Sequence, residues 1–144
     1  MTHSSLLEKY NVAAPRYTSY PTVPYWDDTP ITQLQWQEKA LHAFQQEKAI
    51  SLYIHLPYCE QLCTYCGCNK RITKNHQVES PYIDSVLAEW ALYCEHFGEK
   101  PIIKELHLGG GTPTFFSPLQ LQRLVNGILA KAEVADEYEF SFEA

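Results

Sequence analysis

The 144-residue chain lacks a hydrophobic run long enough to cross a membrane, and it contains few basic residues. A membrane-spanning helix needs about 20 consecutive apolar residues, and no stretch approaches that length. The N-terminal segment also lacks the apolar core of a signal peptide. Lysine and arginine total 11 against 17 acids, a formal net charge of −6 that does not suit a general nucleic-acid surface. We expect a cytoplasmic protein that neither spans a membrane nor binds nucleic acid.

Cysteine is sparse over most of the chain but crowded at one place. Four of the five cysteines lie within Cys59–Cys68, and the fifth, Cys94, falls on the apolar face of a predicted helix. An odd number of cysteines packed so closely does not suit a disulfide framework, so reduced thiols are expected. Because the C-x3-C-x2-C spacing of Cys59, Cys63 and Cys66 gathers three thiolates in one segment, the sequence predicts a metal or cluster site.

The identity of that metal is left open by spacing alone. Structural zinc usually takes four protein ligands, which Cys68 or His55 could complete, giving a zinc-stabilised binding module. A [4Fe–4S] cluster is also bound by thiolates, and three cysteines suffice where the fourth iron takes a non-protein ligand. Pro57 and Gly67 bracket the cysteines, which favours a loop folded around a cluster.

Hydrophobic periodicity predicts an α/β fold. Residues 1 to about 30 are rich in proline and tyrosine and are expected to form an extended arm, followed by a helix over 30–46 with Leu34, Leu41 and Phe44 facing inward. We divide the chain into this arm with its leading helix (1–47) and the first β/α units of a larger core (48–144). The predicted elements of the second part are strands near 50–55, 102–108 and 138–143, and helices over 80–97 and from Ser117, where Gln120 could close a capping box. This order favours parallel strands with helical crossovers. In the first strand, alternation predicts that Ile50, Leu52 and Ile54 point to one face and Ser51, Tyr53 and His55 to the other.

Each predicted strand ends at an unusual feature. The cysteine loop follows the first strand, Gly109-Gly110-Gly111-Thr112-Pro113-Thr114 follows the second, and Glu143 ends the third. Functional groups of parallel α/β sheets gather beyond the carboxyl ends of the strands. The sequence therefore predicts one composite site at this edge. His55, a single histidine at a strand end, is expected to make structural hydrogen bonds.

The string Tyr53-Ile-His55-Leu-Pro-Tyr-Cys59-x3-Cys63-x-Tyr65-Cys66 resembles the signature of radical S-adenosylmethionine (SAM) enzymes. Three further segments make the resemblance more specific: Pro15-Arg16-Tyr17-Thr18-Ser19-Tyr20-Pro21-Thr22, Cys66-Gly67-Cys68-Asn69-Lys70 and the glycine motif. Together they resemble the oxygen-independent coproporphyrinogen III oxidases, also called dehydrogenases. The resemblance implies a partial parallel (β/α) barrel, of which this chain is expected to be an N-terminal piece, inactive alone.

The resemblance also implies roles for individual residues. Cys59, Cys63 and Cys66 would hold a [4Fe–4S] cluster. Tyr53 and Tyr65 would line a first SAM, Tyr65 through its backbone, while Gly110 and Glu143 would contact it. Gly111 and Thr112 match positions linked with a second SAM, and Cys68 would be a catalytic cysteine that is not a cluster ligand.

The implied reaction is the oxidative decarboxylation of two propionates of coproporphyrinogen III to vinyl groups, giving protoporphyrinogen IX in heme biosynthesis. The implied partners are that substrate, an external electron donor and an electron acceptor, and we expect a monomer. The alternative is a radical-SAM-like heme chaperone, which shares the three cluster cysteines but has an aromatic residue where Cys68 stands.

Overall fold

The computed structural model describes residues 3–11, 25–27 and 29–143, and the chain divides into two compact units, Met1–Thr32 and Gln33–Ala144. In the first unit His3–Tyr10 forms helix α1. Our expectation of irregular structure up to residue 30 was wrong for this segment, which contains no proline or glycine to oppose a helix. The motif Pro15–Thr22 lies outside the described residues.

The second unit is an α/β structure, as predicted. Its elements, in chain order, are α2 (Gln33–Gln46), β1 (Ala49–Leu56), β2 (Tyr58–Cys59), β3 (Arg71–Ile72), the short 3-10 helix η2 (His76–Val78), α3 (Glu79–Phe97), β4 (Ile102–Gly110), the 3-10 helix η3 (Pro113–Phe115), α4 (Pro118–Leu129) and β5 (Glu133–Phe142). The predicted order of strands and helices is confirmed, with boundaries shifted by a few residues.

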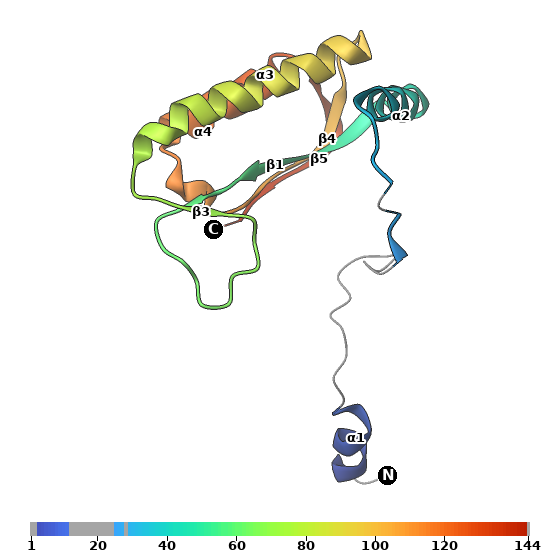
Figure 1. Ribbon diagram of the computed structural model, residues 1–144. Coiled ribbons are helices and arrows are strands. Elements are labelled where there is room, and N and C mark those ends of the chain that lie inside the picture. The colour runs from blue at the N-terminus through green and yellow to red at the C-terminus, as the bar shows by residue number, and fades with distance from the viewer. Residues whose placement is uncertain (1–2, 12–24, 28, 144) are drawn as a thin grey trace. The chain divides into compact units, whose positions relative to one another are not determined.

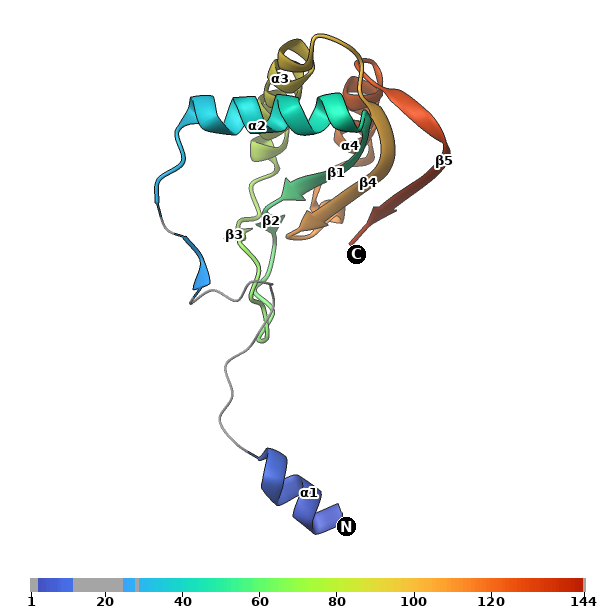
Figure 2. The same cartoon turned by 90° about the vertical axis from the view of Figure 1, so that its right-hand side faces the viewer.

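Strands β1, β4 and β5 form one parallel sheet in the order β1-β4-β5. Helix α3 connects β1 to β4 and helix α4 connects β4 to β5, so each parallel neighbour is reached by a helical crossover. Both helices cover the same face of the sheet, as the two views show (Figures 1 and 2). The short strands β2 and β3 pair separately.

The hydrophobic core lies between the sheet and the two covering helices. Alternation in β1 turns Ile54 and Leu56 inward, while Ser51 and Tyr53 are exposed on the opposite face. The core side chains from the sheet are Ile54, Leu56, Ile103, Leu106 and Leu108, and those from the helices are Ile83, Trp90, Leu124 and Ile128. This confirms the inward and outward sets predicted for β1.

Helix α2 buries less of its surface than predicted. Phe44 is buried and stacks on Phe97 of α3, with the ring centroids 4.2 Å apart. Leu41 is half-buried, but Leu34 is 71% exposed, so its predicted inward position was wrong. The helix contacts α3 through Phe44 and through the Gln37 carbonyl oxygen, which lies 2.9 Å from His96 Nε2.

The start of α4 also differs from the predicted capping box. Ser117 occupies the N-cap position but makes no side-chain capping bond, and Gln120 accepts a hydrogen bond from Arg123 instead. The backbone N–H of Ser117 donates to Glu79 Oε2 at 2.8 Å. A carboxylate from α3 thus replaces the local cap.

Among residues 3–11, 25–27 and 29–143, no helix combines the length and apolarity needed to cross a lipid bilayer.

Candidate functional site

The cysteine loop, the glycine run and Glu143 lie at the carboxyl ends of β1, β4 and β5, as predicted. Backbone hydrogen bonds connect them: Gly111 N–H donates to Leu56 O (2.8 Å), and Glu143 N–H donates to Leu108 O (3.0 Å). Figure 1 shows the green loop leaving the sheet at the same end at which β5 finishes. The parallel topology therefore assembles one site from three distant segments.

The cysteine loop is fastened to the protein at both of its ends. Arg71 N–H donates to Pro57 O at 2.7 Å, and Thr73 N–H donates to Cys59 O at 2.9 Å. His55 Nε2–H donates to the carbonyl oxygen of Asn69 at 2.7 Å, which leaves Nδ1 to accept from the Tyr53 hydroxyl (3.2 Å). The structural role predicted for His55 is confirmed, since both ring nitrogens hold neighbouring segments together.

All four thiols of the loop are free, and they occupy different surroundings. Cys59 lies in β2, where its sulfur accepts a hydrogen bond from the Thr112 hydroxyl at 3.3 Å. Cys63 and Cys66 flank a turn closed by the Cys66 N–H and the Cys63 carbonyl (3.2 Å). A hydrogen bond from the Cys68 backbone lowers the pKa of Cys66, whereas the hydrogen bond to Cys66 and its charge raise the pKa of Cys68.

The three predicted metal ligands do not converge on one point in this structure. Within the described part of the chain, no three Cys, His, Asp or Glu side chains approach closely enough to hold a metal ion. The donor set nevertheless fits a thiolate-bound iron–sulfur cluster, because three unpaired thiols are carried by one loop whose ends are fixed. A structural zinc site would need a fourth ligand brought to the same place.

Glu143 reaches the glycine run. Its Oε2 accepts a hydrogen bond from Gly110 N–H at 2.9 Å. Gly110 has a φ of 106°, a conformation open to glycine, and a Cβ there would lie 2.3 Å from the His55 ring. A Cβ on Gly111 would lie 2.6 Å from the Leu56 carbonyl oxygen. Both positions therefore require glycine for the strand end and the cysteine loop to pack together.

Of the other predicted residues, Tyr53 lies close to Glu143 and Cys68, whereas the side chain of Tyr65 faces solvent. Desolvation, together with the negative charges of Glu143 and Cys68, raises the pKa of the Tyr53 hydroxyl. The side chain of Tyr65 is 90% exposed at the tip of the loop.

Two polar groups beside the site were missed by sequence reasoning. His107 of β4 stacks on Tyr53, with ring centroids 5.7 Å apart and planes at 14°, and its Nδ1 lies 2.8 Å from the Ser141 hydroxyl. The register pairs Tyr53 with His107 and His107 with Ser141 across the three strands. Period-two alternation before the glycine run was the available signal, because it places His107 on the same face as Tyr53.

Sequence reasoning also missed a second polar cluster, formed by Glu60, His76 and Glu79, which contacts the cysteine loop through Glu60. Glu79 is 5% exposed, and its Oε1 lies 2.7 Å from His76 Nδ1, while His76 Nε2 lies 3.2 Å from Glu60 Oε1. His76 stacks on Phe115 with ring centroids 4.4 Å apart. The side-chain hydrogen bonds to Glu79 and Glu60 raise the pKa of His76, and despite desolvation the bonds from Ser117 and His76 hold the pKa of Glu79 below its ordinary value.

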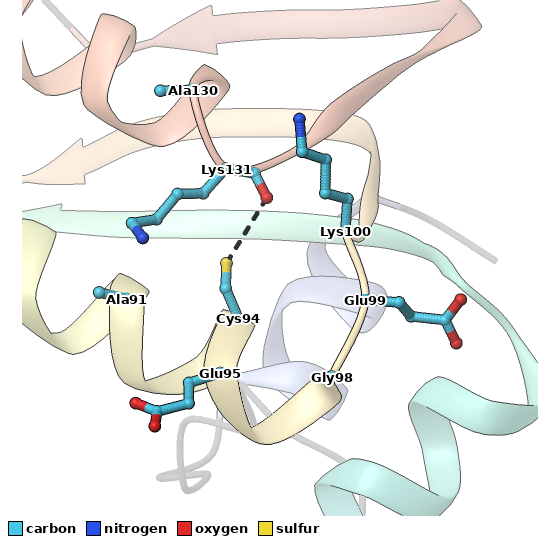
Figure 3. Close-up of a pocket in the computed structure, with 8 residues that line it drawn as sticks. All are labelled: Ala91, Cys94, Glu95, Gly98, Glu99, Lys100, Ala130 and Lys131. Atoms are coloured by element: carbon cyan, nitrogen blue, oxygen red, sulfur yellow. Dashed lines mark hydrogen bonds between the residues drawn. The ribbon is translucent and has the colours of Figure 1, made fainter.

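A shallow pocket of about 580 Å³, open to solvent, lies at the opposite end of the sheet (Figure 3). Its lining comes from the end of α3 and from the turns that precede β4 and β5. Cys94 is half-buried there, donates to the Lys131 carbonyl oxygen at 3.8 Å, and has its pKa raised by burial. This confirms Cys94 as a core-facing thiol remote from the cysteine loop.

The strand-end site and parallel sheet define an α/β core of the radical SAM type, and comparisons with known proteins support this class. No protein-family model matches the chain. The solved structure of coproporphyrinogen III oxidase (HemN) from Escherichia coli, a radical SAM enzyme, is similar with a TM-score of 0.79 and 31% identity, over 97% of this chain and 30% of that one.

Curated relatives carry the same name. An oxygen-independent coproporphyrinogen III oxidase of Mannheimia haemolytica is 34% identical, covering 96% of this chain and 92% of that protein. The Pseudomonas aeruginosa protein of that name is 35% identical over 93% of this chain and 29% of its own length. The chain thus spans about a third of the length of most of these relatives. It belongs to the oxygen-independent coproporphyrinogen III oxidase family.

Proposed function

We propose that the protein catalyses the oxygen-independent conversion of coproporphyrinogen III to protoporphyrinogen IX in heme biosynthesis. The observation that carries this proposal is the meeting of the cysteine loop, the glycine run and Glu143 at one sheet edge in a chain of this family. In each of two rounds a propionate loses one hydrogen atom, one further electron and carbon dioxide, which leaves a vinyl group. The hydrogen acceptor is SAM-derived, and an external acceptor takes the electron.

Cys59, Cys63 and Cys66 are the residues that would hold a [4Fe–4S] cluster. When bound, the reduced cluster and SAM supply the radical that removes the hydrogen atom. The protein contributes a loop whose two ends are hydrogen-bonded to each other, so the segment that carries the three thiols is anchored at both ends. The Thr112 hydroxyl adds a hydrogen bond to the Cys59 sulfur, of the kind that tunes cluster electronics.

The remaining site residues would bind and orient SAM. Tyr53 provides an aromatic surface, Gly110 and Gly111 allow close backbone approach, and Glu143 provides a carboxylate. The proposal keeps Tyr65 as a backbone contact and assigns Gly111 and Thr112 to a second SAM. These assignments rest on the motif and on the location of the residues at the strand ends.

Cys68 is proposed as a catalytic cysteine that does not ligate the cluster. Its thiol neighbours Cys66, and Tyr53 is close enough for the charge of Cys68 to affect the Tyr53 pKa. A thiol in this place lies near the proposed SAM-binding residues Tyr53 and Glu143 without being needed as one of the three cluster ligands.

The proposal has wider parts. Residues 48–144 are taken as the first β/α units of the radical SAM core, following the arm and leading helix of 1–47. The protein is proposed to be cytoplasmic, in keeping with its free thiols, and to act as a monomer with an external electron donor and acceptor.

The test is anaerobic reconstitution of the full-length protein with iron and sulfide. We expect labile sulfide with about four irons per molecule, as the proposed cluster requires, a change in its electron paramagnetic resonance spectrum on adding SAM, and decarboxylation of coproporphyrinogen III with reductant. Cys59→Ser should lose the cluster, while the matched control Cys94→Ser should retain it. Zinc without labile sulfide would reject the proposal, and heme transfer without decarboxylation would favour the chaperone.

The role of Cys68 is tested separately. Cys68→Ser should keep the iron and sulfide content of the parent protein and lose porphyrinogen turnover, since the substitution removes a thiol that is not a ligand. Metal analysis and product analysis on the same preparation measure both properties. Loss of the cluster in this variant contradicts the non-ligand role.

A further inference from the structure

We propose that His107 is a positioning residue that holds Glu143 and Tyr53 in the arrangement needed to bind SAM. This inference rests on the proposed function, because it concerns the same SAM site. His107 belongs to neither the cysteine motif nor the glycine motif. It is identified by its place on the central strand β4, between Tyr53 on β1 and Glu143 at the end of β5.

The first observation is that the two oxygens of Glu143 meet different groups. Oε2 accepts from Gly110 N–H at 2.9 Å, and Oε1 lies 3.7 Å from His107 Nε2. The 3.7 Å separation between Oε1 and Nε2 is too long for a hydrogen bond but short enough for an electrostatic attraction. The Glu143 side chain is about half exposed, and the residue directly follows the last residue of β5. Contacts on both oxygens therefore restrict where its carboxylate points.

The second observation is the hydrogen bond on the other ring nitrogen of His107. Nδ1 lies 2.8 Å from the Ser141 hydroxyl. When that hydroxyl donates, Nδ1 is the acceptor and the proton of the neutral ring sits on Nε2, which faces Glu143. In that arrangement Ser141 favours the tautomer whose Nε2–H faces the carboxylate. This is the way in which a hydrogen bond on one ring nitrogen commonly sets the role of the other.

The third observation is the stack between His107 and Tyr53. The two rings are nearly parallel, with planes at 14° and centroids 5.7 Å apart. The other edge of Tyr53 is fixed by its hydroxyl, which donates to His55 Nδ1 at 3.2 Å. The ring of Tyr53 is thus held by one histidine along its own strand and by a second on the neighbouring strand.

Gly109 makes this arrangement possible. A Cβ at that position would lie 3.0 Å from both Glu143 Cδ and His107 Nε2. A larger residue would enter the space between the carboxylate and the ring. Gly109 therefore has a role that Gly110 and Gly111 do not share, because the missing side chain leaves room for His107 and Glu143 to lie close together.

The variants that test this separate the ring from its polar atoms. His107→Phe keeps an aromatic surface for Tyr53 but removes the interactions with Glu143 and Ser141, and His107→Ala removes both. The matched control is His42→Phe, the same change at an exposed histidine on α2. Iron and sulfide content and thermal unfolding are measured first, and both should match the parent protein for His107→Phe.

SAM affinity is then measured by equilibrium dialysis on the reconstituted, oxidised protein, without turnover. We expect a Kd raised about 5- to 30-fold for His107→Phe, the size of one lost coupled interaction, and more for His107→Ala. In a Glu143→Gln background His107→Phe should raise the Kd less than about twofold, because the histidine acts through that carboxylate.

The outcomes distinguish the inference from the proposed function. A parent protein that fails to bind SAM overturns the proposed function. A parent that binds SAM while His107→Phe has an unchanged Kd overturns only the role of His107. An effect of His107→Phe that is undiminished in the Glu143→Gln background also overturns it, because the histidine would then act by another route.

Discussion

Along β1 and β4, the two faces of the sheet have opposite characters. One face carries Leu56, Ile103 and Leu106, which are buried beneath α3 and α4. The other carries three cross-strand rows in which every residue except Gly109 has a polar side chain: Ser51, Glu105 and Glu139; then Tyr53, His107 and Ser141; then His55, Gly109 and Glu143. Successive residues of one strand therefore contribute to different faces, one to the core and the next to the polar surface.

Under the proposed function, the covered face stabilises the fold and the polar face binds SAM. The covered face removes apolar surface from water, which is the main favourable contribution to folding. The polar face forms hydrogen bonds and ring contacts that converge toward the carboxyl ends. Substitutions on the two faces should consequently change different measured properties.

The largest stability effect is expected for Leu124→Ala on the covered face. Leu124 of α4 is 0% exposed, and truncation of a buried leucine leaves a cavity that costs about 2–5 kcal/mol. Leu119→Ala is the matched control, since Leu119 lies on the same helix and is 71% exposed. Urea unfolding should show a large loss for the first variant and little change for the second. Equal losses would contradict the assignment of the core to this face.

A smaller loss is expected for Glu79→Gln, which removes a buried charge rather than packing. The carboxylate accepts from Ser117 N–H and lies 2.7 Å from His76 Nδ1, and hydrogen bonds to a charged group contribute about 1.5–3 kcal/mol. Unfolding free energies of the parent and the variant, measured across pH, check this. Glu89→Gln, the same change at an exposed position of the same helix, is the control for loss of an acid.

The pH dependence has a defined sign. The pKa of Glu79 is lowered, so its contribution is full above 4.5 and is lost as pH falls through the still lower pKa of the folded state. The pKa of His76 is raised, so its contribution is full below 6.5 and is lost as pH rises through the higher folded value. The difference between parent and Glu79→Gln should peak between pH 4.5 and 6.5. A difference that is flat with pH would contradict this ion pair.

Much of this arrangement could be predicted from the sequence. Period-two alternation gave the correct face for Ile54 and Tyr53, and the strand–helix order gave the parallel sheet and the shared edge of its motifs. Local patterns were less informative where a distant residue decides the outcome. Ser117 has a capping sequence, yet its N–H bonds to Glu79, which is 38 residues away.

The same limit explains what was missed in the site. His107 carries no motif, and its importance arises from neighbours on two other strands, Tyr53 and Ser141. Register across parallel strands is set by tertiary packing, so a single sequence does not contain it directly. The cysteine thiols do not converge in this structure, and their proposed convergence on a cluster would be a further step of this kind, because ligand binding and local folding are coupled at metal sites.

The smallest effect is expected where the polar face is farthest from the site. Ser51 Oγ donates to Glu105 Oε2 at 2.6 Å, and both side chains are exposed, so Ser51→Ala should cost less than about 0.5 kcal/mol. The adjacent Leu52→Ala, on the half-buried side of the same strand, should cost about 2 kcal/mol or more. Urea unfolding compares the two variants.

Ser51→Ala also bounds the site. The row of Ser51 and Glu105 is farther from the carboxyl ends of the strands than the row of Tyr53 and His107. SAM affinity should therefore be unchanged in Ser51→Ala, while it falls in His107→Phe. Equilibrium dialysis on the reconstituted protein measures both. Weaker SAM binding by Ser51→Ala, at normal stability and iron content, would show that the binding surface extends down the whole polar face. The division would then lie between the two faces alone and not also between the two ends of the strands.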